Sequence, residues 1–335
     1  MPPLEKVAAP AAVNVCFLCF CRALRLSLAA SRHGPPDMAS AETPLDDLRR
    51  QIDGIDDALH DLLMRRAEIA ERIGKLKTES AGGAPAVFLR PGREAAVLRR
   101  LVARHKGALP KAVLVRLWRE LVSALLRLQG PFAVAVQGAS HGPGCWELAR
   151  DHFGSLTPAT AHDSPQQVLH AVTAGRAAVG ILPLPDGGDP QPWWPMMLAK
   201  DPKHPRVVAR LPFGAGDTVR GAPIEALIVA QSPLEETGRD RSLLVVEATE
   251  EMSRSALVAD SREAKLAATV IQSWQPPSEA AVWLHLVDVE GFVPLGDKRL
   301  AQLSRRMGKG LQQIWHIGGY AVPLSAAELG PGRKG

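Results

Sequence analysis

Apolar residues recur at alternating steps of three and four positions between Leu45 and Leu76. This spacing keeps side chains on one stripe of a long helix that packs against other helices. One position of the stripe is filled by Arg66, which needs an anionic partner if its guanidinium loses water. Lys77 follows eleven residues later and projects from the same face, roughly 16 Å along the axis. The apolar members of the stripe are Leu45, Leu48, Ile52, Ile55, Leu59, Leu62, Ile69, Ile73 and Leu76.

Two long cations therefore point into one apolar interface, and no acidic residue of this helix has the spacing to neutralise both. This arrangement leaves room for a small anionic ligand. The alternative interpretation is that Arg66 extends its guanidinium to the surface and that Lys77 belongs to a solvated face.

Two shorter helices are predicted after the first, from about Arg93 to Arg104 and from Pro110 to Gln129. Proline suits the first position of a helix, and Gly130-Pro131 provides a stop. The first helix spans roughly 50 Å by its residue count, which two shorter helices cannot cover. We therefore expect a second copy of the chain to cover the rest.

Four short motifs occur in order along these helices. They are Leu48-Arg49-x-x-Ile52-x-x-Ile55-Asp56, Leu62-Leu63-x-Arg65-Arg66-x-x-Ile69-Ala70-x-x-Ile73-Gly74-x-Leu76-Lys77, Arg90-Pro91-Gly92-Arg93-Glu94, and Trp118-Arg119-Glu120-Leu121-Val122-Ser123-Ala124 running on to Leu128-Gln129. Together they resemble the helical chorismate mutase family, the all-α type that is often fused to prephenate dehydratase. The resemblance covers Pro44 to Pro131.

The resemblance implies a dimeric three-helix domain that rearranges chorismate to prephenate. A pericyclic shift needs no nucleophile, metal or cofactor, so the protein holds a dicarboxylate in a compact conformation and stabilises charge on its ether oxygen. By similarity, two arginines bind the carboxylates, and a third arginine comes from the other protomer. A lysine and a glutamine donate hydrogen bonds to the ether oxygen, and a glutamate accepts a hydrogen bond from the ring hydroxyl. The implied catalytic residues are Lys77, Gln129, Glu94 and Arg66, and the implied substrate-binding residues are Arg49 and Arg93.

Helical geometry supports the placement of Arg49 in the pocket of the other protomer. Arg49 lies about 100° off the face of Arg66 on an ideal helix, so the two do not easily share a pocket within one chain. A departure from the family pattern lies at Arg90, where some members carry an acidic residue near the ring hydroxyl. This departure leaves Glu94 alone in that role.

The overall composition is that of an ordinary globular protein. Of its 335 residues, 22% are charged and 46% hydrophobic, and no apolar run reaches transmembrane length. The formal charge of +5 fits a pocket for an anionic metabolite, since no dense basic and aromatic stripe indicates nucleic acid. Outside the first 37 residues Cys145 is the single cysteine, which favours a reducing cytoplasm.

The segment before Met38 differs from the rest of the chain. Its apolar run, residues 13–20, precedes its arginines, whereas a secretory signal places positive charge first. The two interpretations are a spurious upstream extension with Met38 as the true start and a degenerate targeting segment. Both interpretations predict that this segment is disordered.

After Pro131 the pattern changes to short apolar runs. Residues 132–136 and 178–182 are typical of buried strands, with helical patterns near 146–153 and 165–174. This order indicates a βαβ arrangement with a parallel sheet. The glycine-rich turn at 137–144 matches no nucleotide fingerprint and is either a plain loop or an anion-binding turn.

The same stretch resembles the opening lobe of prephenate dehydratase. The outline is kept in Val134 to Phe153, in Ser164-Pro165-x-x-Val168-x-x-Ala171-Val172-x-x-Gly175 and in Val179-Gly180-Ile181-Leu182-Pro183. The family's Thr-Arg-Phe triplet occurs nowhere in the chain, and the interval after Pro183 is too short for a second lobe. These departures argue against dehydratase activity.

The last third of the chain resembles the regulatory ACT module. Strands are predicted at 241–247, 283–291 and 314–323, but the loop that binds an amino acid lacks its usual glycine near Ser253. Phenylalanine sensing is therefore supported by no residue. His285 and His316 are expected to be strand residues with satisfied ring nitrogens, not ligands.

The sequence thus predicts a multidomain chain that acts as a chorismate mutase. Its expected partners are chorismate and a second copy bound through the N-terminal helices, without cofactor, metal, nucleic acid or membrane. The alternatives are a bifunctional chorismate mutase and prephenate dehydratase, and a non-catalytic metabolite-sensing dimer. The predicted regions are a disordered extension (1–43), the all-α chorismate mutase domain (44–131), a partial dehydratase-like α/β region (132–235), an ACT-like α+β region (236–325) and a disordered tail (326–335).

Overall fold

The computed structural model describes residues 43–82, 87–138, 144–201, 203–214, 224–249, 252–277 and 282–330. The chain divides into two units, residues 1–57 and 58–335, and the described part of the first unit is the beginning of one long helix. The extension predicted before Thr43 and the centre of the glycine-rich turn, residues 139–143, lie outside the described residues.

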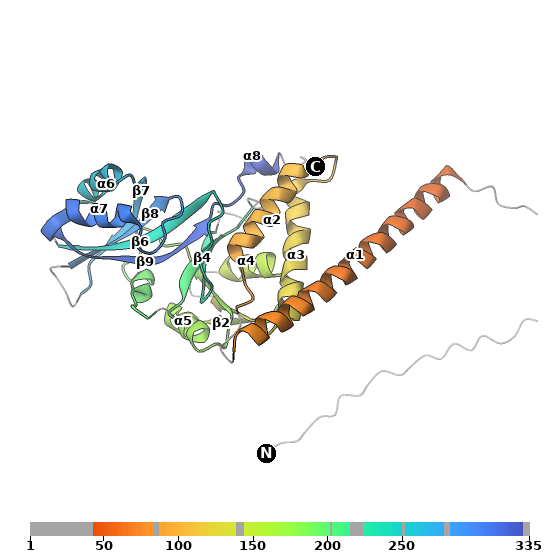
Figure 1. The fold of residues 1–335 in the computed structure, drawn as a ribbon, viewed down its shortest axis with the longest axis horizontal. Coiled ribbons are helices and arrows are strands. Elements are labelled where there is room, and N and C mark those ends of the chain that lie inside the picture. The colour runs from red at the N-terminus through yellow and green to blue at the C-terminus, as the bar shows by residue number, and fades with distance from the viewer. Residues whose placement is uncertain are drawn as a thin grey trace, which may run out of the picture. The chain divides into compact units, whose positions relative to one another are not determined.

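Three helices precede the sheet, as the periodicity predicts. They are α1 (Pro44–Ser80), α2 (Pro91–Arg104) and α3 (Lys111–Gln129) (Figure 1). Proline stands at the start of α2 and caps α3, and Gly130 follows the last residue of α3. The inner faces of α2 and α3 share a core with residues of the C-terminal half of the chain. The members of this core are Ala95, Leu98, Val102 and Val115 from the two helices and Phe213, Leu324 and Leu329 from the C-terminal half.

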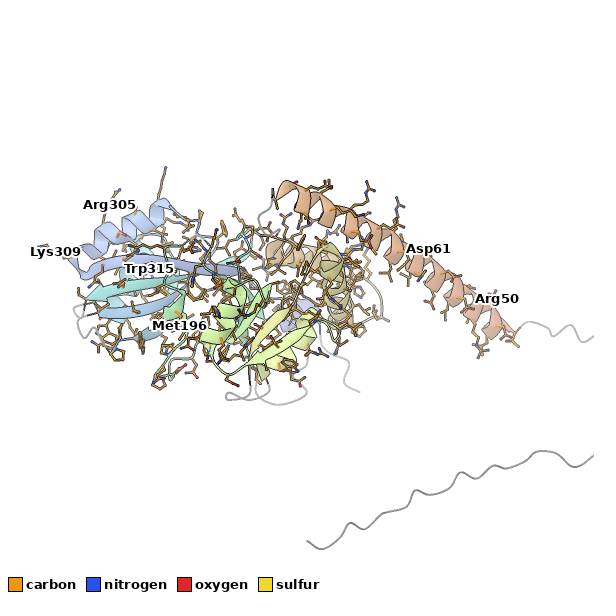
Figure 2. All side chains as sticks on the ribbon, turned by 90° about the horizontal axis from the view of Figure 1, so that it is seen from below. Arg50, Asp61, Met196, Arg305, Lys309 and Trp315 are labelled. Atoms are coloured by element: carbon orange, nitrogen blue, oxygen red, sulfur yellow. The ribbon has the colours of Figure 1, made fainter. Side chains whose placement is uncertain are left out.

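The helix α1 is packed differently from α2 and α3. Its buried residues are Ala70 and Gly74, both near its carboxyl end. The nine apolar residues of the predicted stripe are between 41% and 62% exposed. Around Asp61 no other described element runs beside the helix (Figure 2). A single copy of the chain therefore leaves the apolar stripe of α1 in solvent.

The α/β region that follows contains one nine-stranded sheet with the order β2-β1-β3-β5-β4-β9-β6-β8-β7. The first three strands are parallel, which confirms the predicted βαβ arrangement, and the next two extend the sheet in antiparallel pairing. This half contains β1 (Val134–Gln137), α4 (Gly144–Phe153), β2 (Ala159–His162), α5 (Pro165–Thr173), β3 (Val179–Pro183), the short helix η2 (Trp194–Met197), β4 (Arg206–Leu211) and β5 (Ala226–Ala230).

The other four strands form a β-α-β-β-α-β unit, the order of a ferredoxin-like fold. All its strand pairs are antiparallel, and α6 and α7 share an apolar core with one face of its sheet. The three predicted strands correspond to β6, β8 and β9. The unit contains β6 (Asp240–Thr249), α6 (Arg254–Glu263), β7 (Ala268–Trp274), β8 (Val282–Glu290), α7 (Lys298–Met307), η3 (Gly308–Gly310) and β9 (Leu311–Ala321).

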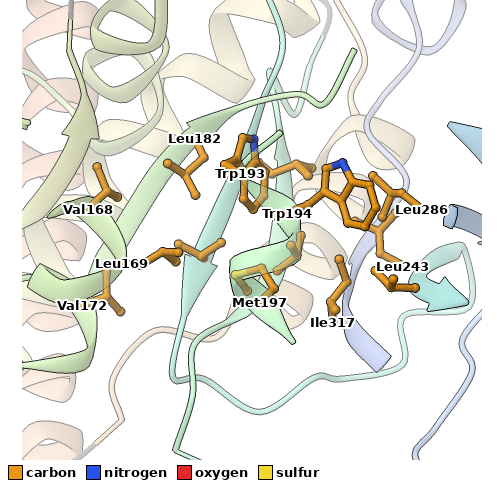
Figure 3. Packing of buried hydrophobic residues seen from close by; sticks show 14 of the residues in the cluster. Val168, Leu169, Val172, Leu182, Trp193, Trp194, Met197, Leu243, Leu286 and Ile317 are labelled. Carbon is orange, nitrogen blue, oxygen red and sulfur yellow. The ribbon is translucent and has the colours of Figure 1, made fainter. Parts of the chain in front are cut away.

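Backbone pairing and buried side-chain contacts both join the halves of the sheet. Val207 of β4 pairs with Gly318 of β9 in parallel, and the close approach leaves no room for a Cβ on Gly318. Around η2, the indole of Trp194 is fully buried and donates to Gln272 Oε1 at 2.8 Å (Figure 3). The predicted boundary at residue 235 therefore falls in the connection between two strands of one sheet.

The predicted disordered tail needs correction. Its first residues form the short helix α8 (Ala326–Leu329), because Ser325 and Glu328 make a reciprocal capping box and Leu329 is buried. Residues 331–335 lie outside the described part of the chain.

Candidate functional site

Lys77 lies in the last turn of α1 and is held by the segment that leads into α2. Its Nζ donates to the carbonyl oxygens of Val87 at 3.1 Å and Phe88 at 3.3 Å, and lies 5.7 Å from the centre of the Phe88 ring. Partial burial lowers the pKa of Lys77, the charge of Arg90 lowers it further, and the charge of Glu235 opposes both. The ammonium is thus fixed in position by acceptors that carry no formal charge.

Gln129 is brought to α1 by a close backbone contact. A Cβ on Gly74 would lie 2.6 Å from the Gln129 carbonyl oxygen, so only glycine allows α1 and α3 to approach this closely. The Gln129 side chain donates from Nε2 to the Leu125 carbonyl at 3.3 Å. Since Lys77 lies one turn beyond Gly74, the structure gathers two of the predicted donors at the same end of α1.

Arg66 is half-buried on the predicted stripe. Its Nη1 is buried and has no hydrogen-bond partner among the described residues, and burial lowers the pKa of the guanidinium. This is the situation that the sequence predicts for an arginine on an apolar face. The described residues supply no acceptor to this nitrogen, so it is a donor that an anionic ligand can bind.

Glu94 is buried in an ion pair instead of facing an open space. Its Oε2 accepts from Arg119 Nη1 at 2.9 Å, and the two side chains are 11% and 8% exposed. Burial raises the pKa of Glu94 although Arg119 opposes the shift. The Arg119 guanidinium also lies 5.0 Å from the centre of the Phe213 ring. The structure thus gives Glu94 a partner within the protein, whereas the family resemblance implies that it binds a substrate hydroxyl.

The imidazole of His152 lies near the same pair. It is buried, and both burial and the charge of Arg119 lower its pKa well below the ordinary value. A small hollow between α2, α3, α4 and the sheet is lined by Glu94, Arg119, His152 and Phe213, among others.

The two predicted substrate-binding arginines are both exposed. Arg49, in the first unit, pairs with Asp46 on the same helix at 3.1 Å. Arg93 lies in the first turn of α2, where its backbone N–H donates to Glu235 Oε2 at 3.2 Å. The structure therefore leaves both guanidinium groups at the surface of a single chain.

Sequence reasoning missed two charged residues of this region. Arg119 had a usable signal, because it stands on the buried stripe of α3 with Val115 and Leu126. Glu235 had none, since it pairs with Arg90 across 145 positions of sequence.

The two strand histidines are only partly satisfied. His285 Nδ1 lies 2.7 Å from Ser273 Oγ and His316 Nε2 lies 2.8 Å from the Val293 carbonyl oxygen, while the other ring nitrogen of each has no partner among the described residues. No group of histidine, cysteine and acidic side chains in the described ranges has the arrangement of a metal site. Within the same ranges no helix is long and apolar enough to cross a membrane.

Comparison with known proteins gives an independent view of the helical segment. Residues 48–130 match the family described as chorismate mutase type II, which confirms the resemblance that the four motifs indicate.

Relatives that match are bifunctional chorismate mutase/prephenate dehydratases. The one from Pseudomonas aeruginosa is 36% identical over 138 residues, which cover 41% of this chain and 38% of the relative. The one from Neisseria gonorrhoeae is 42% identical over 136 residues, which cover 41% and 36%. The alignments thus span less than two-fifths of these relatives.

Among solved structures, the chain matches the prephenate dehydratase from Streptococcus mutans. It is 13% identical, with a TM-score of 0.42, covering 58% of this chain and 100% of the other. A quorum-quenching acylase, GqqA, is 18% identical with a TM-score of 0.43, covering 59% and 98%.

Proposed function

We propose that this chain is a chorismate mutase that rearranges chorismate to prephenate. The observation that carries the proposal is that all six predicted site residues fall inside residues 48–130, the segment that matches the chorismate mutase family. The reaction requires cations for two carboxylates and a donor for the ether oxygen, and it requires no redox or covalent chemistry. The unsatisfied guanidinium of Arg66 and the positioned ammonium of Lys77 meet these requirements.

The working form in this proposal is a homodimer through α1. A helix of 37 residues is about 55 Å long, and its apolar stripe is exposed in one copy of the chain. Burying such a stripe against the same stripe of a second copy removes water from both. The exposed Arg49 then reaches the pocket of the other copy, where it supplies the charge that a single chain lacks.

Glu94 and Arg93 need a change of surroundings in this proposal. For Glu94 to accept from the ring hydroxyl, its carboxylate must share or leave Arg119, which holds it at 2.9 Å. A carboxylate accepts several hydrogen bonds, so sharing is chemically reasonable. Arg93, exposed in the first turn of α2, is free to turn toward a carboxylate.

We also propose a cytoplasmic location. The support is Cys145, which is buried as a free thiol and is the single cysteine of the described residues. Burial raises its pKa to about 11, so it is a structural thiol and not a reactive one.

The decisive experiment is turnover of chorismate by the purified full chain, measured as loss of chorismate absorbance and formation of prephenate. The expected result is enzyme-dependent prephenate that accumulates. No turnover by a folded protein would overturn the proposal and favour the non-catalytic, metabolite-sensing alternative.

A second candidate, the bifunctional enzyme, is favoured by the names of the matching relatives. The chain lacks the Thr-Arg-Phe triplet, and its described residues between β3 and β6 form only η2, β4 and β5. Supplying prephenate and measuring phenylpyruvate at neutral pH separates the two candidates. Enzyme-dependent phenylpyruvate above the uncatalysed background would establish the bifunctional alternative.

A further inference from the structure

Glu235 reaches the amino end of α2 from the segment between β5 and β6. Its Oε1 accepts from Arg90 Nε at 2.7 Å and pairs with Nη2 of the same guanidinium, and its Oε2 accepts from the backbone N–H of Arg93 at 3.2 Å. Gly92 allows this approach, because a Cβ there would lie 2.8 Å from Glu235 Cβ. The carboxylate thus satisfies a free N–H at the start of α2 and neutralises Arg90.

The residue that Glu235 anchors adjoins the acceptors of Lys77. Arg90 comes two residues after Phe88, whose carbonyl oxygen, with that of Val87, accepts from Lys77 Nζ. Between them Leu89 is buried in the core under the sheet. The two acceptors of Lys77 are therefore followed directly by two anchored residues, Leu89, which is fixed by packing, and Arg90, which is fixed by Glu235.

The charges of this group act on Lys77 in opposite senses. The cation of Arg90 disfavours the protonated lysine and the anion of Glu235 favours it. The Glu235 side chain is 21% exposed, so its charge is less screened than that of a fully solvated carboxylate.

We propose that Glu235 is a positioning residue of the site on residues 48–130: it fixes the segment whose carbonyls hold Lys77 and offsets the charge of Arg90 beside that lysine. The proposal rests on the proposed function, because it assigns Lys77 the donor role. It makes the mutase site depend on a side chain that the C-terminal half contributes.

The test compares Glu235→Gln, Arg90→Gln and the double variant, with Glu236→Gln as the matched control, since Glu236 is the exposed neighbour in sequence. The pH dependence of kcat/KM reports groups of the free enzyme. Glu235→Gln should move the alkaline limb to lower pH by about half a pH unit, and Arg90→Gln should move it to higher pH. The double variant should return the limb toward that of the wild type, and Glu236→Gln should leave it unchanged.

A second readout does not depend on turnover. The titration of Lys77 is followed by NMR in protein labelled at the lysine ε-carbon, with Lys77→Arg used for assignment, and its midpoint should shift in the same directions. If the wild type does not convert chorismate, the proposed function fails while the titration still tests Glu235. If the wild type converts chorismate but neither the limb nor the titration moves, or both single variants shift alike, the role of Glu235 is overturned.

Discussion

The backbones of Gly74 and Gln129 approach so closely that a Cβ on Gly74 would lie 2.6 Å from the Gln129 carbonyl oxygen. This contact sets the crossing of α1 and α3 at the end where Lys77 also lies. The glycine in the second sequence motif therefore has a steric reason, because any side chain would push the two helices apart.

Gly74→Ala should destabilise the protein by about 1–3 kcal/mol, the usual cost of overpacking a close contact. It should also lower kcat, since separating α1 from α3 displaces Gln129 from Lys77. Urea unfolding and steady-state kinetics measure the two effects. Gly54→Ala is the matched control, because nothing lies within 4 Å of a Cβ there, and it should gain up to about 1 kcal/mol of helix propensity. Equal behaviour of the two variants would contradict the steric role of Gly74.

Lys77→Ala should reduce kcat by about a hundredfold or more, the loss typical of removing a donor to a developing negative charge. Lys75→Ala, an exposed neighbour on α1, should leave kcat unchanged. Because burial lowers the pKa of Lys77, its donor form disappears as the pH rises through a value below 10.5. The activity of the wild type should therefore fall at a lower pH than an ordinary lysine predicts. A folded Lys77→Ala protein with normal kcat would refute the assignment.

Mixing two inactive variants tests the sharing of sites between copies. Arg49→Ala and Arg66→Ala chains should each be nearly inactive alone, and heterodimers of the two should contain one intact site. Activity should therefore appear on mixing. The control is a mixture in which one chain carries both substitutions, which leaves no intact site when paired with either single variant. Mixtures that stay inactive after verified subunit exchange would rule out a shared site.

Arg119→Met should be strongly destabilising, because it leaves the buried carboxylate of Glu94 without its partner. Breaking a buried pair in this way costs about 3–5 kcal/mol. Replacing both residues, as Glu94→Leu with Arg119→Met, should recover much of this loss. The exposed pair of Arg116 and Asp151, 3.8 Å apart, provides the control, and Arg116→Met should change the free energy of unfolding by less than about 1 kcal/mol. Similar losses at Arg119 and Arg116 would show that burial of the pair is unimportant.

A fragment that ends at Gly130 should unfold at a lower temperature than the full chain. The sequence alone presents the helices as a separable domain, but α2 and α3 bury Leu98 and Val102 with Phe213 and Leu329. Deleting the C-terminal half exposes this apolar surface. Differential scanning calorimetry of the fragment and the full chain measures the difference, and equal transition temperatures would show that the helices are independent.

The sequence predicts the helices and inner strands well, because each has one period that burial enforces. The apolar runs of β1, β3 and β8 are of this kind, because nearly all their residues are buried. On α1 the helical spacing of the stripe predicts the helix, although the stripe is exposed in a single copy of the chain. The edge strands β2 and β7 lack such buried runs, since their residues are mostly half-buried or exposed and carry no clear alternation. No strand is therefore predicted where β7 lies, between the predicted strands at 241–247 and 283–291.

The candidate site shows the same division between local and long-range information. Lys77 and Gly74 lie in one motif and are visible from spacing. The pairing of Glu94 with Arg119 and of Glu235 with Arg90 depends on how separate segments pack, and side-chain identity at one position does not specify its partner across a fold. Sequence motifs therefore identify the hydrogen-bond donors of the site better than they identify the oppositely charged residues that pair with its side chains.

The two halves of the sheet are joined by little backbone pairing, and this affects how each half opens locally in solution. Backbone pairing across this joint consists of the pair Val207 and Gly318 and an isolated bridge between Gly214 and Leu324, and the indole of Trp194 binds Gln272 across the same joint. Strands with so short a ladder between them are expected to belong to different cooperative units in hydrogen exchange. Amide protons of β6 and β8 should then be exchanged in a separate opening from those of β1 and β3, with the buried indole of Trp194 as one of the contacts that couple the two events.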